Sequence, residues 1–97
     1  MDNVQIQSDL AQDGLLIDVR TPEEYVEGHV KDALLIPHTK FFTADIPAKK
    51  DDSIYLYCKM GPRAEFAAGV LKERGYTKVT NLGGLEDMEA LGFEFEK

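Results

Sequence analysis

Short apolar runs recur along the chain at intervals that predict buried strands. Four of them are dense in aliphatic, β-branched or aromatic residues: Leu15–Val19, Ala33–Ile36, Ile54–Tyr57 and Lys78–Leu82. Because Leu15–Val19 is nearly continuous rather than alternating, it is typical of a parallel strand covered on both faces. Val4–Gln7 instead alternates apolar and polar residues, which predicts a short edge strand.

Helical signals lie between these runs. Thr21 is placed as an N-cap, with Pro22 at the first helical position and Glu24 completing a capping box, so a short helix is expected before Gly28. A longer helix after Tyr57 is predicted to end at Arg74-Gly75. Its apolar face is formed by Phe66, Ala67, Val70 and Leu71.

The remaining segments carry weaker patterns. Ser8 and Asp9 predict one brief capped turn that ends at Gly14, and residues 38–52 predict a turn or a short helix packed on the core. Leu85, Met88 and Leu91 predict a last helix of about two turns, followed by an acidic tail. Strands that alternate with helices indicate an α/β fold with helices on both faces of a mostly parallel sheet.

The composition narrows the class of protein. Residues 1–97 fit one domain, and 43% hydrophobic content supports a folded core. The net charge of −7 argues against a nucleic-acid or anionic-membrane surface, and no apolar run reaches membrane length. The first residues lack the basic and apolar regions of a secretory signal, and a single cysteine fits a reducing compartment, so a cytoplasmic monomer is expected. One Cys and two scattered His predict neither a metal nor another cofactor.

The candidate chemistry lies in the loop Cys58–Arg63, between a predicted strand and a predicted helix. Such a loop aims backbone N–H groups and the positive helix end at the thiol of Cys58, which favours the thiolate. Lys59 and Arg63 add positive charge, and Gly61 allows a tight backbone curl. The alternative is that Cys58 is a small buried hydrophobe without a chemical role. The two flanking cations favour the first interpretation.

Three blocks of the sequence then resemble, in order and spacing, the signature regions of single-domain rhodaneses, which are sulfurtransferases. They are IDVRTPEEYVEGHVKDALLIP (residues 17–37), CKMGPR (residues 58–63) and NLGGLEDM (residues 81–88). The resemblance implies a rhodanese-like fold, with a five-stranded parallel sheet and an active-site loop that leads from the fourth strand into a helix. It also implies that Cys58 carries a persulfide.

Three positions depart from the family pattern. The N-terminal helix region is abbreviated to Ser8–Gly14, and Met88 stands where the family usually has a tryptophan. Pro62 lies inside the loop and has no N–H to donate.

The other polar residues receive structural interpretations. Asp18, Arg20 and Glu27 are expected to form a hydrogen-bonded network that fixes the loops at the strand ends. His29 is expected to be a core histidine, and His38 a surface residue.

The function expected from this pattern is transfer of a sulfane sulfur from thiosulfate, or a similar small anion, to a thiol or cyanide acceptor. Cys58 is the nucleophile, Lys59 and Arg63 attract the donor, and the backbone of Met60 and Gly61 stabilises the bound sulfur. A persulfide carrier for a partner protein would use the same residues, whereas a regulatory module usually lacks the cysteine. A cysteine phosphatase is the remaining alternative, but its loop has five residues between cysteine and arginine, and here there are four.

Overall fold

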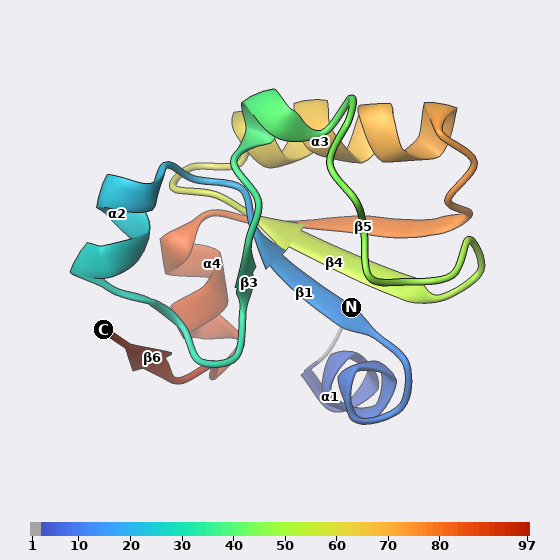
Figure 1. The fold of residues 1–97 in the computed structure, drawn as a ribbon. Helices are drawn as coiled ribbons and strands as arrows, with labels where there is room; N and C mark the ends of the chain where they lie inside the picture. The colour runs from blue at the N-terminus through green and yellow to red at the C-terminus, as the bar shows by residue number, and fades with distance from the viewer. Residues whose placement is uncertain (1–2) are drawn as a thin grey trace.

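A parallel sheet of four strands forms the centre of the molecule in the computed structural model, which describes residues 3–97 (Figure 1). The strands lie in the order β3-β1-β4-β5, and all neighbours are parallel. Their bounds are β1 Leu15–Asp18, β3 Leu34–Leu35, β4 Ser53–Tyr57 and β5 Lys78–Gly83. The predicted parallel sheet is therefore confirmed.

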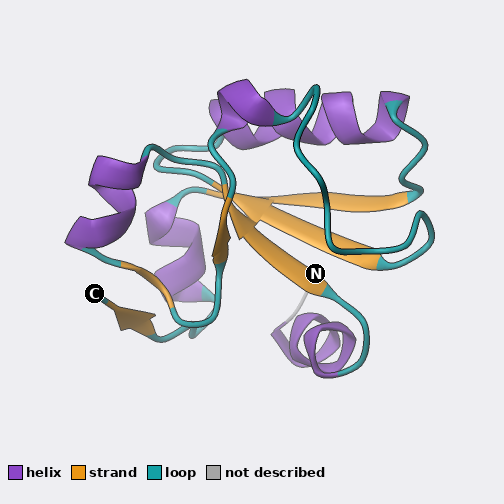
Figure 2. Ribbon diagram, in the orientation of Figure 1, coloured by secondary structure: helices purple, strands orange, loops and turns teal. Residues whose placement is uncertain are grey.

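Helices cover both faces of this sheet (Figure 2). One face carries α3 and the 3₁₀ helix η1, and the other carries α1 and α4, with α2 beyond the ends of the strands (Figure 1). The bounds of the helices are α1 Asn3–Ala11, α2 Pro22–Glu27, η1 His38–Lys40, α3 Pro62–Glu73 and α4 Leu85–Ala90. A separate antiparallel pair is formed by β2 (His29–Val30) and β6 (Phe95–Glu96).

Alternation along β4 divides its side chains between two cores. Ile54 and Leu56 point toward α3 and pack with Ala67 and Leu71, while Tyr55 and Tyr57 belong to the core on the opposite face. The second core includes Ile6 of α1 and Met88 of α4. Met88 is fully buried, so the residue that replaces the family's usual tryptophan serves packing.

The predicted start of α2 is confirmed in detail. Thr21 is the N-cap, its hydroxyl accepts a hydrogen bond from the Glu24 N–H, and the Glu24 carboxylate accepts one from the Thr21 N–H. Pro22 occupies the first turn, where its missing N–H leaves no helical bond unmade. The ends predicted for α3 and α4 also agree with the structure.

The edge strand predicted at Val4–Gln7 and the brief turn after it are wrong, because these residues belong to α1. Ile6 and Leu10 are four positions apart and meet the core on one side of the helix, while Val4 is exposed. The alternation of two apolar residues was too short to distinguish a strand from this helical spacing. The N-terminal helix is therefore longer than the seven residues Ser8–Gly14 suggested.

The count of five strands in one sheet also differs from the structure. The parallel sheet has four strands, and the acidic tail contributes β6, which pairs with β2 outside that sheet. The long-range pairing of His29 with Glu96 left no local signal in the sequence.

The order of the strands positions the site. From β1 the chain crosses to β3 on one side, and β4 and β5 extend the sheet on the other side. The carboxyl ends of β1 and β4 therefore flank a topological switch point, where open α/β sheets usually place a site. Asp18 ends β1 and pairs in register with Tyr57, the last residue of β4.

Candidate active site

Cys58 follows β4 directly and lies fully buried at the carboxyl end of the sheet. Its side chain continues the face of Ile54 and Leu56, so it packs on the α3 side of the sheet. The alternative that Cys58 is a small buried hydrophobe is therefore correct as far as its packing is concerned, since Cys58 is part of an apolar core.

The sulfur of Cys58 nonetheless receives a polar contact from the loop. The backbone N–H of Gly61 donates to Sγ at a distance of 2.8 Å. Gly61 is the N-cap of α3 and has φ +115°, a conformation that residues with a side chain rarely adopt. No side chain caps this helix end, and Pro62 begins its first turn. An N–H at the positive end of a helix thus faces the sulfur.

The loop is fastened to the turn between β5 and α4. Cys58 N–H donates to the Gly83 carbonyl at 3.0 Å, and Leu85 N–H donates to the Lys59 carbonyl at 3.1 Å. A Cβ on Gly84 would lie 2.4 Å from the Lys59 carbonyl oxygen, so a glycine is required for this close approach. The double glycine in the sequence thereby allows the turn to support the cysteine loop.

The structure pairs Arg63 with Glu24 of α2. The guanidinium makes two hydrogen bonds to the carboxylate, at 2.7 and 3.0 Å, and both side chains are partly buried. The hydrogen bonds from Arg63 lower the pKa of Glu24 from 4.5 to about 2, with help from the Thr21 N–H. Arg63 is therefore not a free cation, and sequence reasoning, which treated Glu24 only as a helix cap, missed this partner.

Lys59 and Met60 lie on the outside of the loop. Both are exposed, with 82% of Met60 accessible, and within residues 3–97 Lys59 has no recorded ion pair. The two cations predicted to act together thus differ: one is paired with a carboxylate and the other faces solvent.

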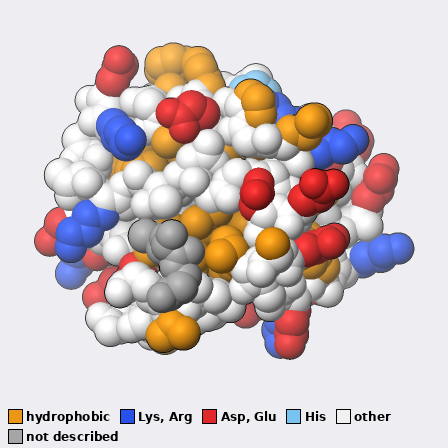
Figure 3. All heavy atoms as spheres, turned by 180° about the vertical axis from the view of Figure 1, so that it is seen from behind, with side chains coloured by type: hydrophobic (Ala, Val, Ile, Leu, Met, Phe, Trp, Pro, Cys, Tyr) orange, Lys and Arg blue, Asp and Glu red, His pale blue; other side chains and the backbone are white. Residues whose placement is uncertain are grey.

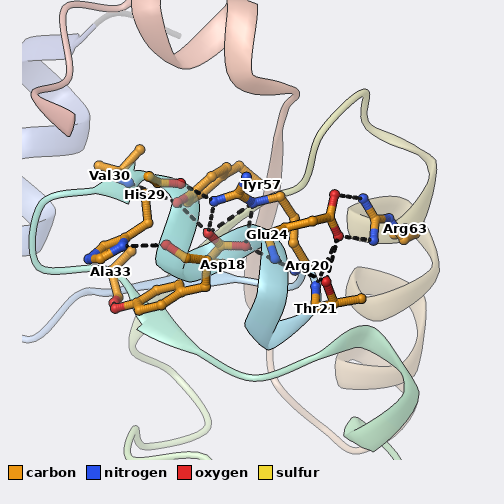
Figure 4. A network of polar contacts seen from close by, with 11 residues as sticks. Asp18, Arg20, Thr21, Glu24, His29, Val30, Ala33, Tyr57 and Arg63 are labelled. Atoms are coloured by element: carbon orange, nitrogen blue, oxygen red, sulfur yellow. Dashed lines mark hydrogen bonds and ion pairs between the residues drawn. The ribbon is translucent and has the colours of Figure 1, made fainter. Parts of the chain in front are cut away.

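A buried polar network lies behind the loop and ties the two strand ends together (Figure 4). Asp18 accepts hydrogen bonds from Arg20, with the shortest side-chain contact at 2.8 Å, and from the Tyr57 hydroxyl at 2.6 Å. Arg20 also donates to the Gly28 carbonyl at 2.6 Å. Burial and the bond to Asp18 raise the pKa of Tyr57 well above its ordinary value of 10. Because all its members are hydrogen-bonded, the network can stay buried without unpaired charge.

The prediction for this network is confirmed for Asp18 and Arg20 and wrong for Glu27. Glu27 is exposed at the end of α2, and Tyr57 occupies the third position. In the sequence, Tyr57 is one of several apolar residues of a predicted buried strand, so its hydrogen bond to Asp18 could not be predicted.

The two histidines lie away from the sulfur contacts. His29 is buried and stacks on Tyr25 with ring centroids 3.7 Å apart, which confirms a core histidine. His38 is half-buried and meets Phe66 edge-on. Phe66 itself is 48% exposed and contacts Phe42, so its predicted place on the buried face of α3 is wrong.

Neither of two hollows on the surface of residues 3–97 is lined by Cys58. A cavity of about 570 Å³ lies by α1 and the amino end of β1, and one of about 390 Å³ lies between Lys59-Met60 and the start of α4. The larger of the two lies at the amino end of β1, whereas the cysteine loop follows the carboxyl end of β4, so size alone does not mark the chemistry.

Known proteins resemble this chain over most of its length. The rhodanese-like domain family matches residues 3–91. Thiosulfate sulfurtransferase PspE of Escherichia coli is 42% identical over 74 residues, which cover 74% of this chain and 71% of that protein. The chain therefore belongs to the rhodanese-like domain family.

Two further relatives extend the comparison. The solved structure described as a rhodanese with anions from E. coli has a TM-score of 0.76 and 36% identity, and the match covers 87% of this chain and 98% of that one. A putative sulfur carrier protein of Bacillus subtilis, YrkF, is 34% identical over 69% of this chain but only 36% of its own length. The relatives named for sulfur chemistry support sulfur transfer, in general terms, for this chain.

Proposed function

We propose that this protein is a thiosulfate sulfurtransferase in which Cys58 carries the sulfur as a persulfide. The observation that carries the proposal is the 2.8 Å contact between the Gly61 N–H and the Cys58 sulfur at the start of α3. A donor aimed at sulfur favours an anion there, whether thiolate or persulfide, in the way an oxyanion hole favours oxygen.

The proposed reaction has two steps. The Cys58 thiolate attacks the sulfane sulfur of thiosulfate, the S–S bond breaks, and sulfite leaves with the electron pair. An acceptor nucleophile, cyanide or a thiolate, then attacks the outer sulfur of the persulfide, and the Cys58 thiolate is released. This order is ping-pong. The backbone of Met60 and Gly61 holds the bound sulfur, and no second cysteine in the chain competes with the external acceptor.

Lys59 and Arg63 contribute unequally to the attraction of the donor anion. Lys59 is exposed and supplies steering charge for a small dianion. Arg63 contributes to the same positive potential, but its pairing with Glu24 reduces that contribution. Because Cys58 is fully buried, a small donor reaches the sulfur more readily than a large one.

A persulfide carrier that serves a partner protein is the second candidate, supported by the likeness to a protein named a putative sulfur carrier. It would load sulfur at Cys58 in the same way and discharge it slowly to small acceptors. The phosphatase alternative loses support because Arg63, which would have to bind phosphate, is held by a carboxylate.

The proposal extends to the oligomeric state, the cellular location and the partners of the protein. We take the chain to act as one rhodanese-like domain, as a monomer in the cytoplasm, with small sulfur donors and thiol acceptors as partners. No helix among residues 3–97 is long and apolar enough to cross a membrane.

The test is thiocyanate formation from thiosulfate and cyanide, repeated with thiol acceptors. Wild-type protein should turn over steadily, and Cys58→Ser should be folded but inactive. Single-turnover loading with slow discharge to small thiols would favour the carrier. Wild-type rates in Cys58→Ser would overturn the assignment of the nucleophile.

A further inference from the structure

Asn81, in the middle of β5, contacts the backbone on two sides of the cysteine loop. Its side-chain oxygen accepts a hydrogen bond from the Gly83 N–H at 2.8 Å. Its side-chain nitrogen donates to the Gly61 carbonyl at 3.2 Å. The same nitrogen also lies 3.2 Å from the carboxylate of Glu65, an exposed contact.

These bonds, together with the two that Cys58 makes, form a closed ring that includes Cys58. Gly83 accepts the Cys58 N–H through its carbonyl, at 3.0 Å, and is itself held by Asn81 through its N–H. Gly61 donates its N–H to the Cys58 sulfur and presents its carbonyl to Asn81. The side chain of Asn81 therefore binds both Gly83, which holds the backbone of Cys58, and Gly61, which contacts its sulfur.

Gly61 needs such support because its own backbone torsions are weakly restricted. With φ +115° and no side chain, it has wide conformational freedom. A Cβ placed there would come no nearer than 3.9 Å to Gly83, so packing does not confine it either. Its carbonyl accepts the first helical bond from the Glu65 N–H, at 3.0 Å, and the bond from Asn81 is a second bond to the same oxygen.

We propose that Asn81 is a positioning residue that holds the Gly61 peptide so that its N–H meets the sulfur of Cys58. Asn81 does not touch the reacting atoms, and it acts through Gly61 and Gly83. The proposal deepens the proposed function, and its consequence for turnover rests on that function. Its consequence for the ionisation and reactivity of Cys58 does not.

Two substitutions and one control isolate the effect. Asn81→Asp keeps the acceptor for Gly83 and removes the donor to Gly61, while Asn81→Leu has a similar shape and removes both. Glu65→Ala removes the exposed contact and leaves the bond to Gly61 in place. Thermal unfolding confirms that each variant is folded, and if Asn81→Leu does not fold, Asn81→Asp decides alone.

The first measurement is the pH profile of Cys58 alkylation by iodoacetamide, in the absence of any sulfur donor. In both Asn81 variants the midpoint should move to higher pH than in wild type, because the misaligned Gly61 N–H favours the thiolate less. Glu65→Ala should keep the wild-type profile. The added charge in Asn81→Asp is screened by salt, so the part of the shift due to geometry should persist at high ionic strength.

The second measurement is turnover with thiosulfate and cyanide. The kcat of the Asn81 variants should fall about tenfold, less than the roughly hundredfold or greater loss expected when an oxyanion-hole donor itself is removed. The KM for thiosulfate should stay within about twofold, because Asn81 does not meet the donor.

The outcomes separate the two proposals. If wild type transfers no sulfur but the alkylation profile shifts in the Asn81 variants, the proposed function fails and the role of Asn81 stands. If sulfur transfer occurs but folded Asn81 variants keep the wild-type profile and kcat, Asn81 is only a structural residue of β5 and the inference is overturned.

Discussion

The two helices that follow β1 and β4 begin in nearly the same way, yet their amino ends are used differently. Both α2 and α3 have a proline in the first turn. At α2 the N-cap is Thr21, and its side chain and that of Glu24 satisfy the helix end. At α3 the N-cap is Gly61, which has no side chain to offer, and its N–H meets the sulfur of Cys58.

The difference shows how one local structure serves stability in one place and chemistry in another. A helix end that its own side chains cap has fewer free N–H groups to offer a ligand. A helix end without a side-chain cap leaves its positive potential to the group in front of it. Glu24 connects the two ends, since it completes the cap of α2 and binds Arg63 of α3.

The largest effect is expected from a change at the N-cap of α3, because it tests whether that helix end has a chemical role. Gly61→Ala should lower kcat for sulfur transfer by roughly a hundredfold, because alanine strains against φ +115° and the N–H turns away from the sulfur. Steady-state kinetics on protein shown by circular dichroism to be folded measures this. Wild-type kcat in this variant would mean that the N–H contact has no chemical role.

Changes that affect the two cations, Lys59 and Arg63, should have a smaller effect, on the KM for thiosulfate. Lys59→Ala should raise KM for thiosulfate roughly two- to fivefold, since an exposed charge contributes about 1 kcal/mol or less. Glu24→Gln should lower that KM, because Arg63 loses its carboxylate partner and regains a free charge. Kinetics at low and high salt checks both, and an unchanged KM in both variants would remove the cations from the donor site.

The matched change at the other helix should affect stability alone. Thr21→Ala should cost about 1 kcal/mol of unfolding free energy, the usual value for a lost N-cap. Its kcat per folded molecule should stay within about twofold of wild type. Urea denaturation and kinetics on the same preparation test this, and a large loss of kcat at unchanged stability would contradict the division of roles.

The last prediction concerns a pH dependence of stability through Glu24. Because Arg63 lowers the pKa of Glu24 from 4.5 to about 2, the ionised carboxylate stabilises the folded state above about pH 4.5. This stabilisation should fade as the pH falls from there toward 2. Denaturation of wild type and Glu24→Gln across this range should show a difference that shrinks with acidification, and a constant difference would contradict the pairing.

The success of the sequence predictions depended on how local each signal was. The capping box of Thr21 and Glu24, the strands around Leu16 and Leu56, and the position of Cys58 all follow from neighbouring residues. The partners of Glu24 and Tyr57 lie 39 positions away in the chain and could not be read from any local pattern. For the same reason β6, which pairs with His29 and Val30, was predicted only as part of an acidic tail.

One kind of local signal was also ambiguous. In α1, a few apolar residues satisfied two periods at once, and propensity did not decide between them. The segment Asn81-Leu82-Gly83-Gly84 belongs to a block that resembles the family pattern, but the role of the Asn81 amide depends on the cysteine loop, which is distant in the sequence.

The central claim is that Cys58 holds a transferable sulfur, and intact mass spectrometry tests it most directly. Protein incubated with thiosulfate and no acceptor should become heavier by one sulfur atom, the Cys58→Ser variant should not, and added cyanide or thiol should restore the original mass. An unchanged mass, together with hydrolysis of aryl phosphates that depends on Cys58, would contradict sulfur transfer and favour a phosphatase.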